Sequence, residues 1–228
     1  MEYAQMSKFY DILYNKKNYK NEVEFLKSLF NTKTKNILDV GCGTGTHAKL
    51  LEENGYIVDG IDSSAEMIDI AKQKCSGKFE KANLLTYSTT KKYDAIISMF
   101  AVFNHLKNHK QLENGIKNLL KILNINGIII IDLHNPQKNG QKQDVVNNIS
   151  RTMKWRVCRL LNKEFSKISY TYNNQTFNTK HTFKIFNIIK LKKIATKLNC
   201  NVEMFENYTK TPATKHSKNI QLIIKKLK

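Results

Sequence analysis

The stretch from Asn36 to Thr46, with the sequence NILDVGCGTGT, constrains the fold more than any other part of the chain. The short apolar run at 37–40 is typical of a buried parallel strand. It leads directly into three glycines at alternate positions, Gly41, Gly43 and Gly45, and an amphipathic segment follows. A strand, a glycine turn and a helix in this order present bare backbone N–H groups and a helix N-terminus to a ligand. We therefore predict an α/β sheet with a ligand site at this turn.

The spacing of the glycines excludes two common ligand sites. A dinucleotide-binding turn has its third glycine at the sixth position of the motif, where this chain has Thr46. A phosphate-binding P-loop ends in Gly-Lys-Ser/Thr, a tripeptide that the chain lacks. Asp39 ends the strand just before the glycines. We expect its carboxylate to meet a cationic amino group, directly or through a water.

The order of the other segments predicts the topology. Five strands (37–40, 56–61, 78–82, 93–98 and 128–133) alternate with helices, which indicates a doubly wound parallel sheet. After a helix at 188–198, strands at 202–208 and 219–226 should pair antiparallel at one edge. The fold class is thus α/β, with a seven-stranded, mostly parallel sheet.

Residues 135–186 interrupt this pattern. Residues 135–150 are polar and predict a loop, and the runs 153–160, 165–172 and 177–186 predict an antiparallel meander. We expect this insertion to form a β cap that builds the substrate pocket. The core would then comprise residues 1–134 plus 187–228, and the cap residues 135–186.

Several residues fall at the carboxyl edge of the predicted parallel sheet, where ligands bind in such folds. Asp62 follows the second strand, 17 residues after Gly45, and could accept two hydrogen bonds from a ribose diol. His105 lies just past the fourth strand, and its ordinary pKa suits it to accept a proton near neutral pH. The remaining candidates for cofactor contacts along this edge are Ser63, Met67, Asn83, Leu84 and Met99. Met67 is equally well explained as a core residue.

Two further groups of side chains are candidates. The first 20 residues are rich in rings: Tyr3, Phe9, Tyr10, Tyr14 and Tyr19. They either pack an N-terminal helix onto the sheet or line a site with their faces against a sulfonium cation. Tyr14 of this group is a candidate for substrate binding. From the insertion, Arg151, Arg156, Tyr170, Tyr172 and His181 are candidates for binding an anionic, hydroxylated substrate. An ordinary solvated sheet face explains any one of these five equally well.

The composition limits the partners. The net charge is +19, but nearly all of the positive charge is lysine, whereas bidentate recognition of phosphate or guanine favours arginine. We therefore favour a solvated surface over a nucleic-acid footprint, with part of the charge attracting an anionic substrate. The four cysteines show no C-x-x-C spacing, which favours reduced thiols in a cytoplasmic protein, with Cys42 filling space in the loop. No long apolar run predicts a membrane span, no leader pattern opens the chain, and we predict no metal site.

Four segments together resemble class I S-adenosylmethionine-dependent methyltransferases. They are YDILY…NY (10–19), LDVGCGTGTH (38–47), MFAVFNHL (99–106) and KHTFKIF (180–186). More narrowly, they are similar to nucleotide-linked amino-sugar N-methyltransferases. The resemblance implies S-adenosylmethionine as cofactor and places His105 and Tyr3 beside the transferred methyl group. In this family the position of Asn83 often holds an acid that contacts the adenine amino group, and Asp62 stands where a glutamate is frequent.

The function implied is transfer of a methyl group, by in-line displacement, to an amine or hydroxyl of a small molecule, most simply a nucleotide-linked sugar. The main alternative is an O-methyltransferase acting on another phosphorylated or nucleotide-linked surface-carbohydrate precursor. An RNA or protein methyltransferase and a non-catalytic basic nucleic-acid-binding module fit less well. Pro136 and Pro212 are the only prolines, so the Asp/Asn-Pro-Pro-Tyr motif of base-amine methylation and the Pro-Cys motif of cytosine methylation are both excluded. The oligomeric state stays open.

Overall fold

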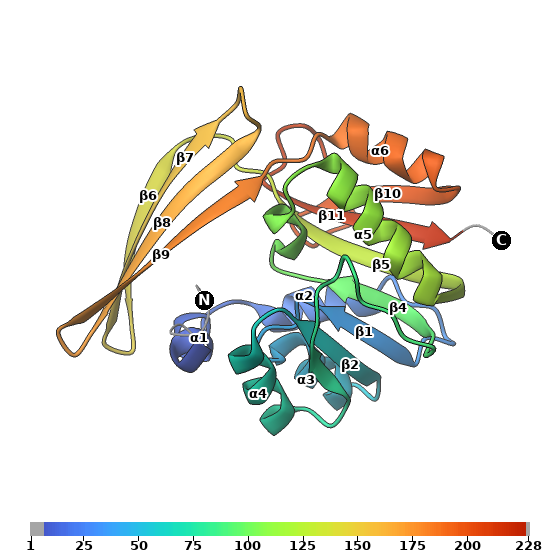
Figure 1. Cartoon of the computed structure of the whole chain (residues 1–228), viewed down its shortest axis with the longest axis horizontal. Coiled ribbons are helices and arrows are strands. Elements are labelled where there is room, and N and C mark those ends of the chain that lie inside the picture. Colours follow the sequence, from blue (N-terminus) through green and yellow to red (C-terminus); the bar gives the residue numbers. More distant parts are fainter. Residues whose placement is uncertain (1–6, 227–228) are drawn as a thin grey trace.

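The computed structural model describes residues 7–226, and its centre is a seven-stranded sheet. Across the sheet the strand order is β10-β11-β5-β4-β1-β2-β3 (Figure 1). Strands β1 to β5 run parallel, and β10 and β11 form an antiparallel pair joined to β5 at one edge. Their bounds are β1 Asn36–Val40, β2 Ile57–Asp62, β3 Phe79–Lys81, β4 Tyr93–Ser98, β5 Leu123–His134, β10 Cys200–Glu206 and β11 Asn219–Lys226. The predicted doubly wound, mostly parallel sheet is confirmed.

Helices cover both faces of the sheet. Helices α2 (Tyr19–Lys27), α3 (Thr46–Glu53) and α4 (Ala65–Lys74) pack their apolar side chains against one face. Helices α5 (His109–Ile122) and α6 (Ile188–Lys197) do so on the other face. The central strands β1 and β4 are buried at all but one position each, as expected for a parallel sheet covered on both sides.

A second sheet of four antiparallel strands forms the cap. It contains β6 (Gly140–Val146), β7 (Ile149–Cys158), β8 (Lys163–Tyr172) and β9 (Gln175–Lys184), paired in chain order. Figure 1 shows this sheet standing beside the core, with one face turned toward the core and α1 (Ser7–Leu13). We call this the inner face, and the opposite one the outer face. The predicted antiparallel meander is confirmed.

Two sequence predictions about strands were wrong. Residues 140–146, expected within a loop, form the edge strand β6, because pairing with β7 satisfies the backbone of a segment too polar to show a strand pattern. The strand expected at 128–133 spans Leu123–His134. Its first part pairs with Tyr93 before an irregularity at Asn126, which has a positive φ of 64°. Residues 126–127 are therefore an interruption within a longer strand.

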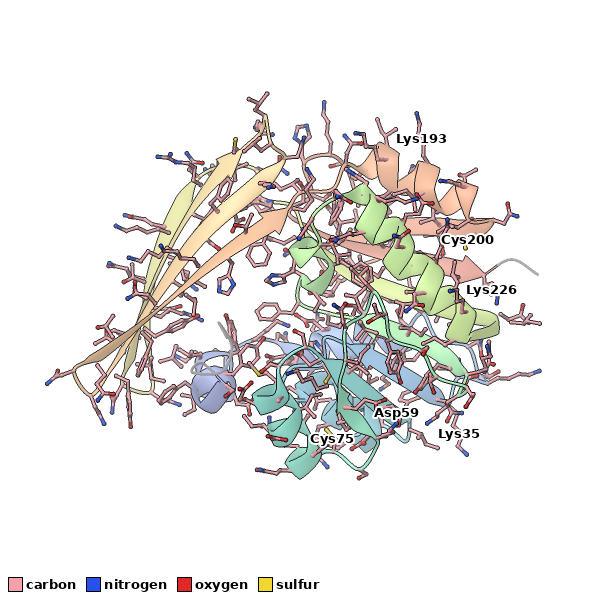
Figure 2. The ribbon with its side chains drawn as sticks, viewed as in Figure 1. Lys35, Asp59, Cys75, Lys193, Cys200 and Lys226 are labelled. Atoms are coloured by element: carbon pink, nitrogen blue, oxygen red, sulfur yellow. The ribbon has the colours of Figure 1, made fainter. Side chains whose placement is uncertain are left out.

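Two short elements lie between the core and the cap. Helix α1 packs Leu13 against Ile149 and Tyr170 of the cap. The 3₁₀ helix η1 (Val102–His105) follows β4 at the carboxyl edge of the sheet. The amino ends of β1 and β2 lie on the far side of the core from the cap, where Figure 2 labels Lys35 and Asp59. The carboxyl edge therefore faces α1 and the cap.

None of the helices within residues 7–226 combines the length and the apolar composition that crossing a bilayer would require.

Candidate active site

The glycine turn between β1 and α3 forms the floor of the site. All three glycines adopt positive φ: 73° at Gly41, 55° at Gly43 and 80° at Gly45. A Cβ at Gly41 would lie 2.4 Å from Val102, and one at Gly45 would lie 2.9 Å from Cys75, so both positions are closed by packing. At Gly43 a Cβ would meet nothing within 4 Å. The turn is therefore tightly held at its two ends and open at its centre, where a ligand can approach the backbone.

Asp39 lies beneath this opening with an unsatisfied carboxylate oxygen. Its side chain is buried, and Oδ2 has no hydrogen-bond partner. Burial, reinforced by the charge of Asp62, raises the pKa of Asp39 to about 8. A buried acceptor without a partner is costly, so this oxygen suits a cationic donor supplied by a ligand.

Asp62, at the end of β2, closes the side of the turn. Its Oδ2 accepts the Gly43 N–H at 3.0 Å, and its Oδ1 accepts the Ser64 N–H at 2.9 Å. Ser64, rather than the exposed Ser63, caps α4 through its hydroxyl. Burial raises the pKa of Asp62, although the backbone donors around it act in the opposite direction. The bonds fix the carboxylate in place and leave lone pairs for further donors, such as hydroxyls.

The other predicted cofactor residues differ in exposure. Met67 and Met99 are buried, and Met99 belongs to the core cluster beneath α2 to α4. Leu84 is partly buried against the opposite core cluster. Asn83 is exposed, and its Oδ1 already accepts the Leu85 N–H at 2.9 Å. An adenine amino group would have to share this oxygen.

The N-terminal rings gather at the end of β4. Tyr14 lies edge-on to Phe100 with ring centroids 5.0 Å apart, and Tyr10 packs on Tyr14 at 4.8 Å. Lys17 places its Nζ 4.2 Å from the centre of the Tyr19 ring and 4.9 Å from that of Phe100. A cation thus lies within an aromatic cluster next to the glycine turn.

The backbone that carries Phe100 is in an unusual conformation. Phe100 and Ala101 both adopt a φ of 62°, which non-glycine residues rarely do. The buried Asp132 accepts the Phe100 N–H at 3.1 Å and holds this turn. Strained residues of this kind concentrate at functional sites, so the turn between β4 and η1 is a second indication of a ligand site.

Asn104 determines where His105 lies. Its amide nitrogen donates to the carbonyls of His134 and Lys184, at 2.8 and 2.7 Å, and its oxygen accepts the His134 N–H at 2.9 Å. These bonds join η1 to the ends of β5 and β9. His105 is thereby placed at the junction of core and cap.

The ring of His105 faces two rings of β9. Its centroid is 4.7 Å from that of Phe183 and 6.1 Å from that of His181. Although the side chain is exposed, the surrounding protein and then the His181 ring lower the pKa of His105 to about 4. The imidazole is therefore neutral at pH 7 and able to accept a proton.

The inner face of the cap brings together most of the predicted substrate residues. Strand registers place Arg151, Tyr170 and Phe177 in one row across the sheet. A second row contains Trp155, Ser166 and His181. Burial raises the pKa of Tyr170, and the ring of Tyr172 packs on Phe9 at 5.3 Å.

Arg151 is held rigidly and keeps one nitrogen for a ligand. Its Nε and Nη2 donate to the two oxygens of Asp144, at 2.8 and 2.6 Å, and its guanidinium lies 5.4 Å from the Tyr14 ring. The side chain is 7 % exposed, and Nη1 has no hydrogen-bond partner. In the second row, the buried Oγ of Ser166 also lacks one. Both groups suit the oxygen atoms of a polar substrate.

Two of the predicted site residues are not seen at the candidate active site. Arg156 is exposed and, five positions after Arg151 in the same strand, lies on the outer face. Tyr3, predicted to lie beside the transferred methyl group, falls outside the described residues. Cys42 is buried, and burial raises the pKa of its thiol well above the ordinary value, as expected for a space-filling residue.

The sequence reasoning missed Asp11 and Lys17. Asp11 on α1 accepts a hydrogen bond from the Thr44 hydroxyl at 2.5 Å and pairs with Lys74 of α4, so it ties α1 to the glycine turn. Lys17 pairs with the buried Glu22, whose other neighbour is His47. No local pattern distinguishes Lys17 among the many lysines of the chain.

Comparison with known proteins finds a family match for part of the chain. Residues 37–127 match the family model described as a methyltransferase domain. This match covers the glycine turn, Asp39, Asp62 and His105. Within residues 37–127 the chain is thus similar to methyltransferase domains.

Individual relatives narrow the comparison. The chain is 28% identical over 147 residues to a putative methyltransferase of Geobacillus sp. (strain WCH70), covering 60% of each chain. It is 24% identical over 135 residues to the dTDP-3-amino-3,6-dideoxy-alpha-D-glucopyranose N,N-dimethyltransferase of Streptomyces fradiae, covering 57% of this chain and 53% of that one. The chain therefore matches only about half to three fifths of the length of these two relatives. In fold it is similar to an S-adenosylmethionine-dependent methyltransferase from Clostridium acetobutylicum, with a TM-score of 0.83, 17% identity and 98% coverage of both chains.

The residues present fit S-adenosylmethionine. The partnerless Asp39 oxygen suits its ammonium, Asp62 suits its ribose hydroxyls, and the open centre of the turn at Gly43 leaves room for close approach. The fit rests on the chemistry of these groups and on the space at Gly43.

Proposed function

We propose that this protein transfers a methyl group from S-adenosylmethionine to an amine of a small, anionic substrate, namely a nucleotide-linked amino sugar. One observation carries the proposal. A neutral imidazole, His105, stands where the carboxyl edge of the methyltransferase sheet meets the inner face of the cap. The relative from Streptomyces fradiae, whose printed name describes an amino-sugar N,N-dimethyltransferase, supports the choice of acceptor.

Residues from three elements would hold the methyl donor. Asp39 binds the ammonium, Asp62 binds the ribose, and Lys17 is placed to face the carboxylate. Met67, Leu84 and Asn83 lie on the side proposed for adenine, while Tyr10, Tyr14 and Tyr19 line the side next to the sulfonium. When bound, S-adenosylmethionine supplies an electrophilic methyl group on a sulfonium.

His105 would act on the acceptor. An amine attacks only through its free lone pair, so a neutral imidazole can remove or relay the proton of an ammonium group. A pKa near 4 makes His105 a weak base in the free protein. An anionic substrate beside it would favour the protonated ring and so raise this pKa toward the working pH.

The inner face of the cap would bind the acceptor, and we propose residues 135–186 as the substrate-binding unit. The free Nη1 of Arg151 is suited to a phosphate or carboxylate oxygen, because a guanidinium already fixed by Asp144 loses little entropy on binding. Tyr170, Tyr172, Ser166 and His181 on the same face would contact hydroxyl groups.

We propose the cytoplasm as the compartment. All four cysteines, each within the described residues, are free thiols, in keeping with a reducing environment.

The proposal is tested by a binding screen followed by an activity assay. S-adenosylhomocysteine should raise the melting temperature, and a nucleotide-linked amino sugar should raise it further. With S-adenosylmethionine present, mass spectrometry should detect a methylated amine. Methylation of the hydroxyl analogue and not of the amine would show that the protein is an O-methyltransferase. Failure to bind both S-adenosylhomocysteine and S-adenosylmethionine would refute the proposal.

A further inference from the structure

The hairpin that joins β7 and β8 exposes apolar side chains at one end of the cap. Leu160 is 91 % exposed, and Leu161 next to it is also exposed. Phe165, on the outer face of β8 just beyond the hairpin, is a third exposed apolar residue. Isolated exposed apolar residues are common, but adjacent ones at a protruding turn indicate an interaction surface.

The first turn of α6 lies beside this hairpin. The Ile185 N–H donates to the Asn162 carbonyl at 2.9 Å, and Lys184 Nζ donates to the Leu161 carbonyl, also at 2.9 Å. Two residues later Asn187 caps α6, in which Ile189 is 65 % exposed. Figure 1 shows the β7–β8 turn and α6 along the same upper edge of the molecule. We call the surface formed by Leu160, Leu161, Phe165 and Ile189 the apolar tip.

Several cations are close in the sequence to the residues of the apolar tip. Arg159 and Lys163 flank the two leucines in the sequence, and Lys193 follows Ile189 by one helical turn. Lys193, labelled in Figure 2, projects from α6 at the upper edge of the molecule. Partial burial and then the nearby charges of Lys163 and Lys190 lower the pKa of Lys184. Like charges therefore accumulate here without local compensation.

No acidic side chain offsets this charge on the described cap strands. Between residues 136 and 202 the only acids are Asp144 and Glu164. Asp144 pairs with Arg151, and Glu164 is buried against His134. Across the outer face, Lys154, Lys167 and Lys180 stand directly opposite one another on three neighbouring strands, an arrangement that destabilises the sheet unless an anion faces it.

We propose that the apolar tip and the cations close to it in the sequence dock this protein on the surface of an anionic lipid bilayer. Leucines, an isoleucine and a phenylalanine insert between lipid headgroups, while lysines and arginines bind the negative surface. A nucleic acid would match the charge but would leave Leu160 and Leu161 exposed to water. The combination of positive charge and exposed apolar side chains thus favours a lipid surface over a nucleic acid. This inference is independent of the methyl-transfer proposal. None of the hydrogen bonds described above joins a side chain of the apolar tip to a residue of the candidate active site.

The test is co-sedimentation of the full chain with vesicles. The wild-type protein should bind vesicles of equimolar phosphatidylcholine and phosphatidylglycerol, and rising sodium chloride should weaken the binding. Pure phosphatidylcholine vesicles should bind little. The double variant Leu160→Ser/Leu161→Ser should bind anionic vesicles at least about tenfold more weakly than the wild type. Its melting temperature should not change, because both side chains are exposed.

Two matched variants test whether the loss of vesicle binding is specific to the leucines of the apolar tip. Ile125→Ser removes an apolar residue of 68 % exposure outside the tip and should bind as the wild type does. Lys163→Gln/Lys193→Gln keeps the leucines and should weaken binding and reduce its salt dependence.

Three results would overturn the proposal. The first is equal binding of wild-type protein to anionic and neutral vesicles, or binding to neither. The second is that the leucine double variant and the wild type bind an RNA duplex equally tightly and also bind anionic vesicles equally tightly. This result would indicate a nucleic-acid surface. The third is a change from dimer to monomer in the leucine variant by sedimentation velocity, which would make the tip an interface between copies.

Discussion

Two glycines with similar backbone conformations occupy different places in this chain. Gly43 has a φ of 55° and Gly55 a φ of 86°, and a Cβ at either position would meet nothing within 4 Å. Gly43 forms the open centre of the glycine turn, whereas Gly55 ends the loop that follows α3. Substituting each glycine in turn therefore distinguishes the loss of stability caused by backbone strain from the loss of affinity caused by blocking a ligand.

We expect Gly43→Val to abolish binding of S-adenosylhomocysteine and Gly55→Val to leave it intact. Both variants place a branched side chain at positive φ, which costs about 1–2 kcal/mol of stability. Only valine at position 43 blocks the approach to the turn. Calorimetric titration measures affinity and thermal unfolding measures the shared strain. Retained affinity in Gly43→Val would contradict the assignment of the turn.

His105→Asn should lower turnover at least about tenfold, since general-base catalysis contributes about 100- to 10,000-fold. Affinity for S-adenosylhomocysteine should stay unchanged. The pKa of His105 is lowered to about 4, so the free protein carries a neutral ring at every pH above about 6. The loss in kcat/KM, which reports the free enzyme, should therefore be similar from about pH 6 to 8. His216→Asn, at an exposed position, is the control. Equal turnover in both variants would remove His105 from the mechanism.

At the scale of elements, α1 connects the two halves of the site. Through Leu13 and Phe9 it packs on the cap, and through Asp11 it bonds to Thr44 of the glycine turn. The same carboxylate pairs with Lys74 of α4. Under the proposed function, a ligand at the turn and a substrate on the cap would therefore both be adjacent to this short helix.

We expect Asp11→Asn to loosen α1 and weaken binding of S-adenosylhomocysteine. Because the Asp11 side chain is 42% exposed, solvent screening limits the loss to about 1 kcal/mol, roughly fivefold in affinity. Hydrogen exchange should rise in residues 7–14. Glu24→Gln, which breaks the exposed pair with Lys27 on α2, should change neither quantity. Unchanged exchange in Asp11→Asn would show that α1 is held by its apolar contacts alone.

At the scale of the whole molecule, buried carboxylates link stability to pH. Burial raises the pKa values of Asp39, Asp62 and Asp132. A folded state in which a carboxyl group has a raised pKa binds more protons than the unfolded state, so stability falls as pH rises between the two pKa values. For Asp39 that interval runs from its ordinary pKa of about 3.9 to about 8.

We expect Asp39→Asn to flatten the pH dependence of the free energy of unfolding. In the wild type, Asp39 alone contributes a loss of up to about 1.4 kcal/mol per pH unit within this interval. Urea unfolding at about pH 5.5 and pH 8 measures the difference between the two proteins. S-adenosylhomocysteine should stabilise the wild type more at the higher pH, because its ammonium pairs with the ionised carboxylate. Parallel pH curves for the two proteins would show that Asp39 has an ordinary pKa.

Local patterns were sufficient for most of the core. The glycine turn, the acids at the ends of β1 and β2, and the alternation of strands and helices depend on neighbours in the sequence. The predicted order of elements in the core agrees with the sheet, although β5 is longer than expected. Strand β6 could not be predicted, because its residues are polar and only pairing with β7 makes them a strand.

The amino-acid sequence by itself determined the doubly wound sheet, the glycine turn and the placing of His105 after β4, because backbone conformation and side-chain period are local properties. Only the tertiary structure decided which side chains share a site. Arg151 and Arg156 look alike in the sequence, yet the pleat sends one to the inner face and the other to the outer face. Likewise, Lys17 meets Phe100, and Asn104 fixes His105 against the cap, through contacts between residues distant in the chain. Such contacts follow from how elements pack, and packing depends on the whole chain at once.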